Sequence, residues 1–374
     1  MLKLSTLCFA ALVLLQSPSG FADTLPAAAP AAALVDPALA ARIDASVSRY
    51  YKPADPGATI IVMKDGRTVF RKAYGMADVA KRVPMTPDTV LRLGSITKQF
   101  TSTAILMLAD EGKLSVSDDI TRYLPAYPTH GKKITIEHLL THTSGIVSYT
   151  GKPAFRATMT KDMTVAQMID SFKGDKPDFE PGSQWRYNNS GYFLLGAIIE
   201  EVSGMPYAKF VEQRIFVPLE MNDTAYEGYE RGTAARAAGH SGAWGRYAPN
   251  APLSMSQPYA AGALVSTVDD LARWDAAVSS GKLLTAASWR KAFTAYTLDG
   301  GAPTKYGYGW MLDQIQGAPT IGHGGDINGF SAFALRLPSE HLYIAVLSNA
   351  DSGLVEPQTV AEKIAAIAIG KPHR

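Results

Sequence analysis

The chain has 374 residues, 47% of them hydrophobic and 19% charged, with 36 Lys and Arg against 34 Asp and Glu. This composition is typical of a globular protein that buries a large core, and the scattered glycines and prolines exclude a collagen-like repeat. Because basic and acidic residues are interspersed and no run of Lys and Arg occurs, the sequence argues against nucleic acid as a partner.

The first 22 residues have the pattern of an export signal. Residues 1–3 carry a positive charge, residues 4–15 are apolar, and small residues precede a cleavage site that we expect after Ala22. The apolar run is shorter than the ~20 residues that span a bilayer, so we expect no membrane span after cleavage, with an uncleaved anchor as the alternative. The only cysteine, Cys8, lies in this segment. A mature chain without disulfides suits a bacterial periplasm or exterior.

Hydrophobic periodicity predicts the next elements in chain order. After a flexible Ala- and Pro-rich tether over residues 23–36, residues 37–51 have the apolar spacing of a helix. Residues 58–75 contain two β-type runs around an Asp-Gly pair, which predicts a hairpin. A helix that is apolar on most sides begins at Ser95 and ends at Gly112.

The middle and the C-terminal third of the chain differ in character. Helices are predicted over residues 190–202 and 267–279. The runs "FSAFALRLP" (330–338) and "LYIAVLSNA" (342–350) predict a second hairpin, and a helix follows over 355–369. Strands at both ends and helices between them predict an α+β fold: an antiparallel sheet built from both chain ends and flanked by helices, with an inserted, mostly helical lobe.

We expect one folded domain over residues 37–374. Its sheet lobe would comprise about 37–93 and 300–374, and its helical lobe about 94–299. The segment 224–258 is long and rich in glycine and tyrosine, and its conformation is not predicted. Loops of this kind often form the walls of binding sites.

The stretch "GSITKQF" places Ser95 and Lys98 three positions apart at the start of the buried helix. Such positions lie on one face, about 5–6 Å apart at Cβ, so the ammonium can reach the serine Oγ. Serine is a weak nucleophile until a base removes its proton, and burial lowers a lysine pKa toward that role. The same spacing at Ser279 and Lys282 falls at a predicted helix end, so the spacing alone is a weak signal.

Tyr187, Asn188 and Asn189 lie on the predicted loop that leads into the helix from residue 190. A phenol beside a lysine has its anion favoured and can relay the proton of a serine. An asparagine amide offers donors and an acceptor for a peptide-like group. The alternative is a turn in which asparagine only caps the helix.

His323, Gly324 and Gly325 stand in "IGHGGDINGF", just before the C-terminal strands. An edge strand of small residues would let a ligand lie against the backbone, with the N–H of Asp326 free to point at a substrate oxygen. The alternative is a glycine turn with a surface histidine.

Other catalytic patterns do not occur in the sequence. His138 and His142 are four positions apart, but no glutamate follows the first, so the zinc-protease pattern fails and we expect no metal. Neither a Gly-x-Ser-x-Gly elbow, a Walker loop nor a dinucleotide fingerprint is present, so we expect no cofactor. A mature chain without cysteine excludes thiol chemistry.

The motifs Ser95-Ile96-Thr97-Lys98, Tyr187-Asn188-Asn189 and His323-Gly324-Gly325, in this order, resemble those of the serine β-lactamase and penicillin-binding superfamily. The likeness runs from about residue 43 to residue 369 and includes "LLTHTSGI", "PGSQWRYNNSGY" and "YGYGW". The branch that it resembles most contains class C β-lactamases, D-alanyl-D-alanine carboxypeptidases, D-aminopeptidases and family VIII esterases. The resemblance implies a site between a sheet and a helical lobe.

This resemblance implies a catalytic role for four of the matching residues. Ser95 would be the acylated nucleophile, and Lys98 and Tyr187 would share the proton transfer, with either as the general base. The backbone N–H groups of Ser95 and Asp326 would form the oxyanion hole, worth ~3–4 kcal/mol per donor.

The resemblance also implies a substrate-binding group. Asn189 would contact the acyl side chain, and His323 would face the leaving group or a substrate carboxylate on a strand that includes Gly325. Class C lactamases mostly carry Lys-Thr-Gly at the third motif, and a fixed cation suits the carboxylate of a β-lactam or a peptide end. A histidine suits that carboxylate less unless it ionises.

The leading hypothesis is an exported active-site-serine hydrolase that forms a Ser95 acyl-enzyme. Its substrate would be a D-amino-acid peptide, for example one derived from peptidoglycan, or a small ester. A true β-lactamase is the alternative within the same class. A non-catalytic protein that binds peptidoglycan fragments is the alternative from another class, and a costly buried lysine argues against it. The sequence leaves the oligomeric state open.

Overall fold

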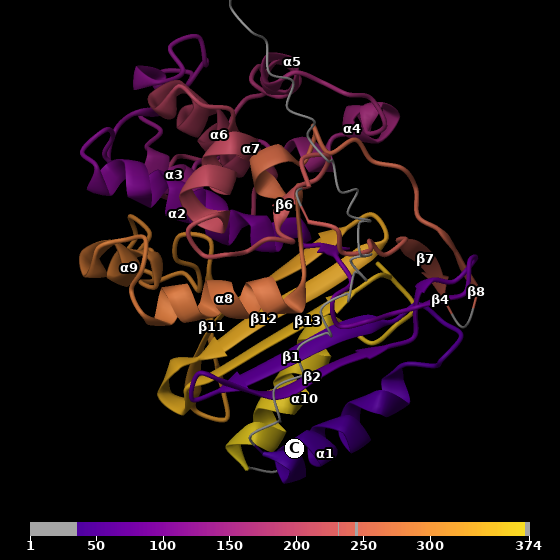
Figure 1. Cartoon of the computed structure of the whole chain (residues 1–374). Coiled ribbons are helices and arrows are strands. Elements are labelled where there is room, and N and C mark those ends of the chain that lie inside the picture. The colour runs from indigo at the N-terminus through magenta and orange to yellow at the C-terminus, as the bar shows by residue number, and fades with distance from the viewer. Residues whose placement is uncertain (1–35, 231, 244–245, 371–374) are drawn as a thin grey trace, which may run out of the picture. The chain divides into compact units, whose positions relative to one another are not determined.

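A six-stranded antiparallel sheet carries the fold (Figure 1). The computed structural model describes residues 36–230, 232–243 and 246–370. Strands from the two ends of the chain meet in this sheet, whose order is β10-β11-β12-β13-β1-β2. The predicted sheet built from both chain ends is therefore confirmed. The strand bounds are β1 Ala58–Lys64, β2 Arg67–Tyr74, β10 Met311–Ile315, β11 Ala318–Ile327, β12 Phe330–Leu337 and β13 Leu342–Ser348.

Both faces of the sheet are buried by helices. Ile60 and Val62 of β1 pack with helices α1 (Pro37–Val47) and α10 (Pro357–Ile369), whereas Ile61 belongs to the main core on the opposite face. Figure 1 shows α1 and α10 together on one face, and α8 (Val268–Ser279) contacts β1 and β13. Because both faces of the inner strands β1, β12 and β13 are covered, these strands are buried on successive residues rather than alternately.

Helix α2 (Thr97–Asp110) runs through the main core. All of its residues from 97 to 108 are buried, and α6 (Asn189–Ser203) packs beside it. The Phe100 ring contacts the rings of Phe216 and Trp274, at centroid distances of 5.6 and 4.4 Å. The prediction of a helix buried on most sides is confirmed. Ser95 itself lies in η2 (Gly94–Ile96), a 3-10 turn that leads into α2.

The remaining elements are short. The helices are α3 Ile136–Leu140, α4 Pro153–Thr158, α5 Val165–Asp170, α7 Tyr207–Val211 and α9 Ala286–Ala292. Three small sheets pair β3 Met76–Asp78 with β4 Val83–Pro84, β5 Leu91–Arg92 and β6 Ala225–Tyr226 with β9 Leu264–Ser266, and β7 His240–Ala243 with β8 Arg246–Pro249. Strands β6, β7 and β8 fall in the segment 224–258, for which we predicted no conformation.

Two predictions on the organisation of the chain are not tested by these elements. Contacts divide the chain into Met1–Ala33 and Leu34–Arg374. The predicted signal peptide lies outside the described residues, and the division into a sheet lobe and a helical lobe stays a prediction. None of the helices within the described ranges combines the length and the apolar character that crossing a bilayer requires.

The third sequence motif lies in the half of β11 that extends beyond β10, so residues 323–325 have the open strand edge that we predict, although β11 as a whole is the second strand of the sheet. Strand β10 pairs with residues 318–322 of β11, and β12 pairs with residues 321–327. The second half of β11 thus extends beyond β10, and there it contacts the turn η2 that holds Ser95. The expected open strand is present over half of β11, because the neighbouring strand is short.

Candidate active site

Lys98 lies at the centre of the site, on the first turn of α2. Its Nζ is 2.9 Å from Ser95 Oγ, 2.8 Å from Asn189 Oδ1 and 2.9 Å from the carbonyl oxygen of Ala261. The side chain is fully buried, and this burial holds the pKa of Lys98 well below its usual range. Ser95, in contrast, is partly exposed. The structure therefore joins a solvent-accessible hydroxyl to a buried amine.

The three partners of Lys98 determine which hydrogen bonds an uncharged amine can donate and accept at this position. The Asn189 Oδ1 and the Ala261 carbonyl can only accept hydrogen bonds, so they take the two N–H groups of an uncharged Nζ. Ser95 Oγ is the one partner that can donate as well as accept, so the lone pair of an uncharged Nζ would face it. The role of Lys98 as the base that takes the serine proton stays a prediction.

Tyr187 contacts the same centre through its ring. Lys98 Nζ lies 4.8 Å from the ring centroid, and the Tyr187 hydroxyl is buried without a hydrogen bond of good geometry. Burial raises the pKa of Tyr187, and the nearness of the Ser95 hydroxyl opposes this only in part. The expectation that a neighbouring lysine favours the phenolate is therefore wrong for the substrate-free state, because the desolvation of the phenol outweighs it.

The two asparagines of the second motif divide two roles between them. Asn188 is the N-cap of α6, and its side chain accepts the N–H of Gly191 at 2.8 Å. Asn189, the first residue of α6, directs Oδ1 to Lys98, while its Nδ2 donates to Thr150 Oγ1 at 3.2 Å. The capping alternative is thus correct for Asn188 and does not describe Asn189.

His323 is buried and has both ring nitrogens engaged by the protein. Nδ1 lies 2.6 Å from the Gly324 carbonyl, which can only accept, so Nδ1 carries the hydrogen. Nε2 then accepts from the hydroxyl of Tyr306 at 2.7 Å. Burial and the nearby Lys98 lower the pKa of His323 to about 3. The His323 side chain therefore offers a substrate neither a cation nor a free ring N–H in this state.

Two glycines let the backbones of η2 and β11 touch. A Cβ on Gly325 would lie 2.0 Å from the carbonyl oxygen of Leu93 and 3.0 Å from the Ser95 nitrogen. A Cβ on Gly94, whose φ is 51°, would lie 3.0 Å from the Asp326 nitrogen. The contact thus brings the backbone nitrogens of Ser95 and Asp326 to the same junction. Their role as an oxyanion hole stays a prediction.

Sequence reasoning missed two members of the site. Tyr306 lies in the stretch "YGYGW", where nothing indicates that its hydroxyl meets a histidine 17 positions later. The Ala261 carbonyl belongs to the backbone, so no side-chain pattern could identify it. Ser279, which has the same spacing to a lysine as Ser95, is the last residue of α8 and accepts a hydrogen bond from Arg336 at 2.7 Å. The prediction that this serine lies at a helix end is confirmed.

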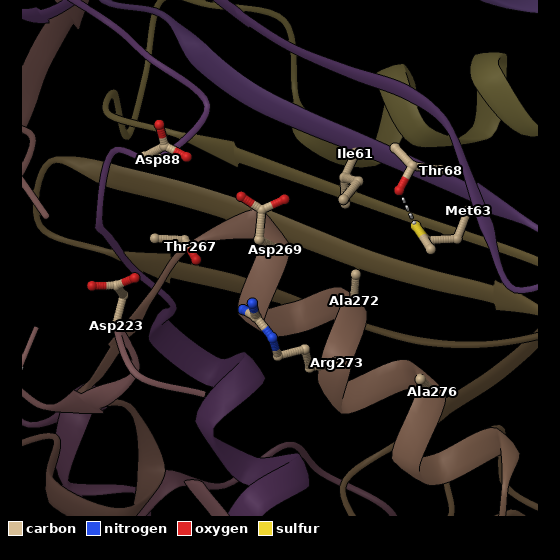
Figure 2. A pocket seen from close by; sticks show the side chains of 10 residues that line it. All are labelled: Ile61, Met63, Thr68, Asp88, Asp223, Thr267, Asp269, Ala272, Arg273 and Ala276. Atoms are coloured by element: carbon tan, nitrogen blue, oxygen red, sulfur yellow. Dashed lines mark hydrogen bonds between the residues drawn. The ribbon is translucent and has the colours of Figure 1, made fainter. Parts of the chain in front are cut away.

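A cavity elsewhere in the chain is not part of this centre. Figure 2 shows this space of about 440 Å³, which lies beside α8 and β1. Acidic side chains dominate its polar lining, and none of the predicted site residues lines it; the acids are Asp88, Asp223 and Asp269. Asp88 and Asp269 are both paired with Arg71, so these two carboxylates are already compensated.

Comparisons with known proteins match most of the chain. The family model Beta-lactamase matches residues 37–369. Penicillin-binding protein 4* of Bacillus subtilis is 29% identical over 335 residues, which cover 84% of this chain and 73% of that protein. Protein flp of Staphylococcus aureus is 29% identical over 308 residues, which cover 80% of this chain and only 61% of that protein.

Solved structures are also similar to this chain over most of its length. The octameric penicillin-binding protein homologue from Pyrococcus abyssi is 30% identical, with a TM-score of 0.78 over 88% of this chain and 77% of that one. The D-stereospecific amidohydrolase from Streptomyces sp. is 29% identical, with a TM-score of 0.75 over 89% of this chain and 99% of that one. The fold is therefore shared with these two proteins.

Proposed function

This chain belongs to the β-lactamase family, and from that premise we propose that it is a serine hydrolase that forms an acyl-enzyme at Ser95. The observation that carries the proposal is the position of Lys98 Nζ, 2.9 Å from Ser95 Oγ, with its two other contacts both to acceptors. A protein that only binds fragments gains nothing from burying an amine beside a serine, because that burial costs free energy.

The residues support a two-step reaction. Ser95 Oγ attacks the substrate carbonyl carbon while its proton passes to Lys98 Nζ, and the tetrahedral oxyanion lies against the backbone N–H groups of Ser95 and Asp326. The C–N or C–O bond then breaks, and the leaving group takes the proton. Tyr187, whose hydroxyl is near Ser95, relays that proton in our proposal. Water hydrolyses the acyl-enzyme by the same groups in reverse.

For the substrate we propose a D-amino-acid amide or peptide without a carboxylate next to the scissile bond, or a small ester. The neutral His323, with both nitrogens engaged, gives no charge-assisted hydrogen bond to a carboxylate near the scissile bond. The similarity to a D-stereospecific amidohydrolase supports the D-amino-acid class. A β-lactam or a peptide ending in a free carboxylate fits this site less well.

A covalent probe tests the hydrolase proposal. A fluorophosphonate should add to the purified protein in a one-to-one ratio, as measured by intact mass, and Ser95→Ala should abolish the adduct. Phosphonylation at another residue, or none with any acylating probe, would rule the proposal out.

A substrate panel tests the choice of substrate. D-phenylalanine p-nitroanilide and p-nitrophenyl acetate should exceed a D-Ala-D-Ala peptide and a chromogenic cephalosporin in kcat/KM. We expect a factor of roughly 10 to 100, the equivalent of one charge-assisted hydrogen bond. Faster turnover of the carboxylate substrates would contradict our interpretation of His323.

We also propose that the chain acts in a periplasm or outside the cell. Residues 1–22 support this through their charge and apolar pattern. Expression of the full chain in a bacterium, followed by mass analysis, should give a protein that begins at Asp23. A protein that keeps residue 1 and stays in the cytoplasm would refute export.

A further inference from the structure

His142 is a buried histidine next to the site whose conformation is costly. It is 1% exposed and has φ = 61°, in the left-handed region that only a few per cent of non-glycine residues adopt, histidine among the more frequent of them. Its position after the end of α3 explains why the backbone is left-handed there, but not why the residue is a histidine. The N–H of His142 reaches the Leu139 carbonyl and that of Thr143 reaches the His138 carbonyl, closing α3 in a Schellman motif that usually contains glycine.

A second cost lies in the His142 ring. Nδ1 accepts the backbone N–H of Asn188 at 3.1 Å, so the hydrogen of the neutral ring is on Nε2. That Nε2–H is buried and has no hydrogen-bond partner among the described residues. The left-handed backbone costs ~1–3 kcal/mol, and the unpaired buried donor costs about 1–3 kcal/mol. Because glycine at this position would avoid both costs, we infer that the ring has a role that glycine would not fill.

His142 holds the loop of Tyr187 on both sides. Its carbonyl oxygen accepts the N–H of Arg186 at 3.0 Å, and its Nδ1 accepts the N–H of Asn188. The ring packs on the Tyr187 ring with centroids 4.4 Å apart, and on the ring of Tyr306 at 4.6 Å. Tyr187 is therefore fixed by the residue before it, the residue after it and its own ring face.

We propose that His142 is a positioning residue that fixes Tyr187 in the geometry for proton transfer. This inference rests on the proposed function, because Tyr187 has a proton to relay only if Ser95 is acylated. His142 need not touch the substrate. It acts through two backbone hydrogen bonds and one ring contact.

Two substitutions separate the acceptor from the backbone strain. His142→Gly and His142→Asn both suit a left-handed residue, but only asparagine keeps an oxygen where Nδ1 stands. We expect His142→Gly to lose roughly 100-fold in kcat with KM changed little, as for other small misplacements of catalytic groups. His142→Asn should recover most of that loss. Equal losses in both variants would overturn the proposal.

A double-mutant cycle identifies Tyr187 as the target. In a Tyr187→Phe background, His142→Gly should lower kcat by less than about threefold, because the group that it positions is already gone. Fully additive losses would mean that His142 acts elsewhere, and would overturn the proposal. His130→Gly is the matched control, since His130 has φ = 53° on the exposed surface, and its kinetics should equal those of the wild type.

The outcome is distinct from failure of the proposed function. Wild-type protein is first labelled with the fluorophosphonate, so a missing adduct refutes the hydrolase before any variant is made. Circular dichroism and the midpoint of urea unfolding identify the folded variants. If His142→Gly does not fold, His142→Gln serves instead. Glutamine places its amide near Nε2 rather than Nδ1, so it should lose kcat where asparagine retains it, and wild-type kcat in this variant would overturn the proposal.

Discussion

Lys98 is the residue on which the chemistry depends, because the fold buries its amine against the Ser95 hydroxyl. We expect Lys98→Ala to lose 10²- to 10⁴-fold in kcat/KM, the usual contribution of a positioned base. Lys98→Arg is the sharper variant, since a guanidinium keeps hydrogen-bond donors but does not release a proton in proteins. Both should fail equally in steady-state assays. Substantial activity in Lys98→Arg would transfer the role of base to Tyr187.

The lowered pKa of Lys98 also sets the direction of the pH dependence. The neutral amine is the active form, so kcat/KM should rise with pH and level off well below pH 10.5, the ordinary value for lysine. A profile of kcat/KM from pH 4 to 10 on an uncharged ester checks this. A rate that still climbs at pH 10 would mean that Lys98 is charged at neutral pH.

His323 links the site to acid stability. Its pKa is about 3 in the folded chain, against 6.5 when unfolded, so between these values the unfolded chain binds more protons. The free energy of unfolding should therefore fall as the pH drops from 6.5 toward 3, by up to about 1.4 kcal/mol per pH unit from this group. Urea titrations at pH 7 and 4 measure it. His323→Gln should reduce the slope but not abolish it, because burial also lowers the pKa of His142, whereas the exposed His130→Gln should leave it unchanged.

At the scale of elements, the junction of η2 and β11 depends on one glycine. A Cβ at Gly325 would lie 2.0 Å from the Leu93 carbonyl oxygen, whereas at Gly324 the nearest atom would be 3.4 Å away, on the Phe333 ring. Gly325→Ala should destabilise the fold by about 1–3 kcal/mol and push β11 away from Ser95, lowering kcat/KM by roughly 100-fold.

The adjacent glycine supplies the control for that prediction. Gly324→Ala should keep nearly wild-type kinetics and stability, since 3.4 Å is an ordinary contact. Steady-state kinetics and urea unfolding of both variants compare the two positions. Equal behaviour would mean that the close backbone contact is not what assembles the site.

The elements also explain what the sequence could predict. Local signals sufficed for the hairpin around Asp65, for the buried helix after Ser95 and for the C-terminal strands, because turn residues and apolar spacing act over a few positions. Contacts between segments that are far apart in the sequence have no comparable local pattern of residues. The hydroxyl of Tyr306 on His323 and the carbonyl of Ala261 on Lys98 follow from packing alone, and the length of β10 decided that β11 is open over only half its extent.

At the scale of the whole chain, the site depends on a sheet in which strands from the two ends of the chain pair with each other. Strand β13 pairs with β1 on one side and with β12 on the other. The N-terminal hairpin and β11, the strand of His323, therefore belong to the same sheet. Ser95 follows the N-terminal part of the chain, and His323 precedes the last strands. Any loosening between the two ends therefore displaces the nucleophile relative to the third motif.

Asn349 is the residue that ties these ends together, directly after β13. It is fully buried; its Oδ1 accepts the N–H of Gly57 at 2.8 Å, and its Nδ2 lies 3.0 Å from the Met76 carbonyl and 2.9 Å from the Ala238 carbonyl. Asn349→Ala leaves these backbone groups unpaired in the core. We expect a loss of at least about 2 kcal/mol in the free energy of unfolding, measured in urea.

The matched control for Asn349 is the exposed Asn222, where alanine should change the free energy of unfolding by less than about 0.5 kcal/mol. Asn349→Asp distinguishes the two halves of the amide, because it keeps the acceptor for Gly57 and removes the donors while burying a charge. It should be less stable than Asn349→Ala at pH 7 and recover partly at pH 4, where the carboxyl is protonated. A variant as stable as the wild type at both pH values would show that the two chain ends are held by strand pairing alone.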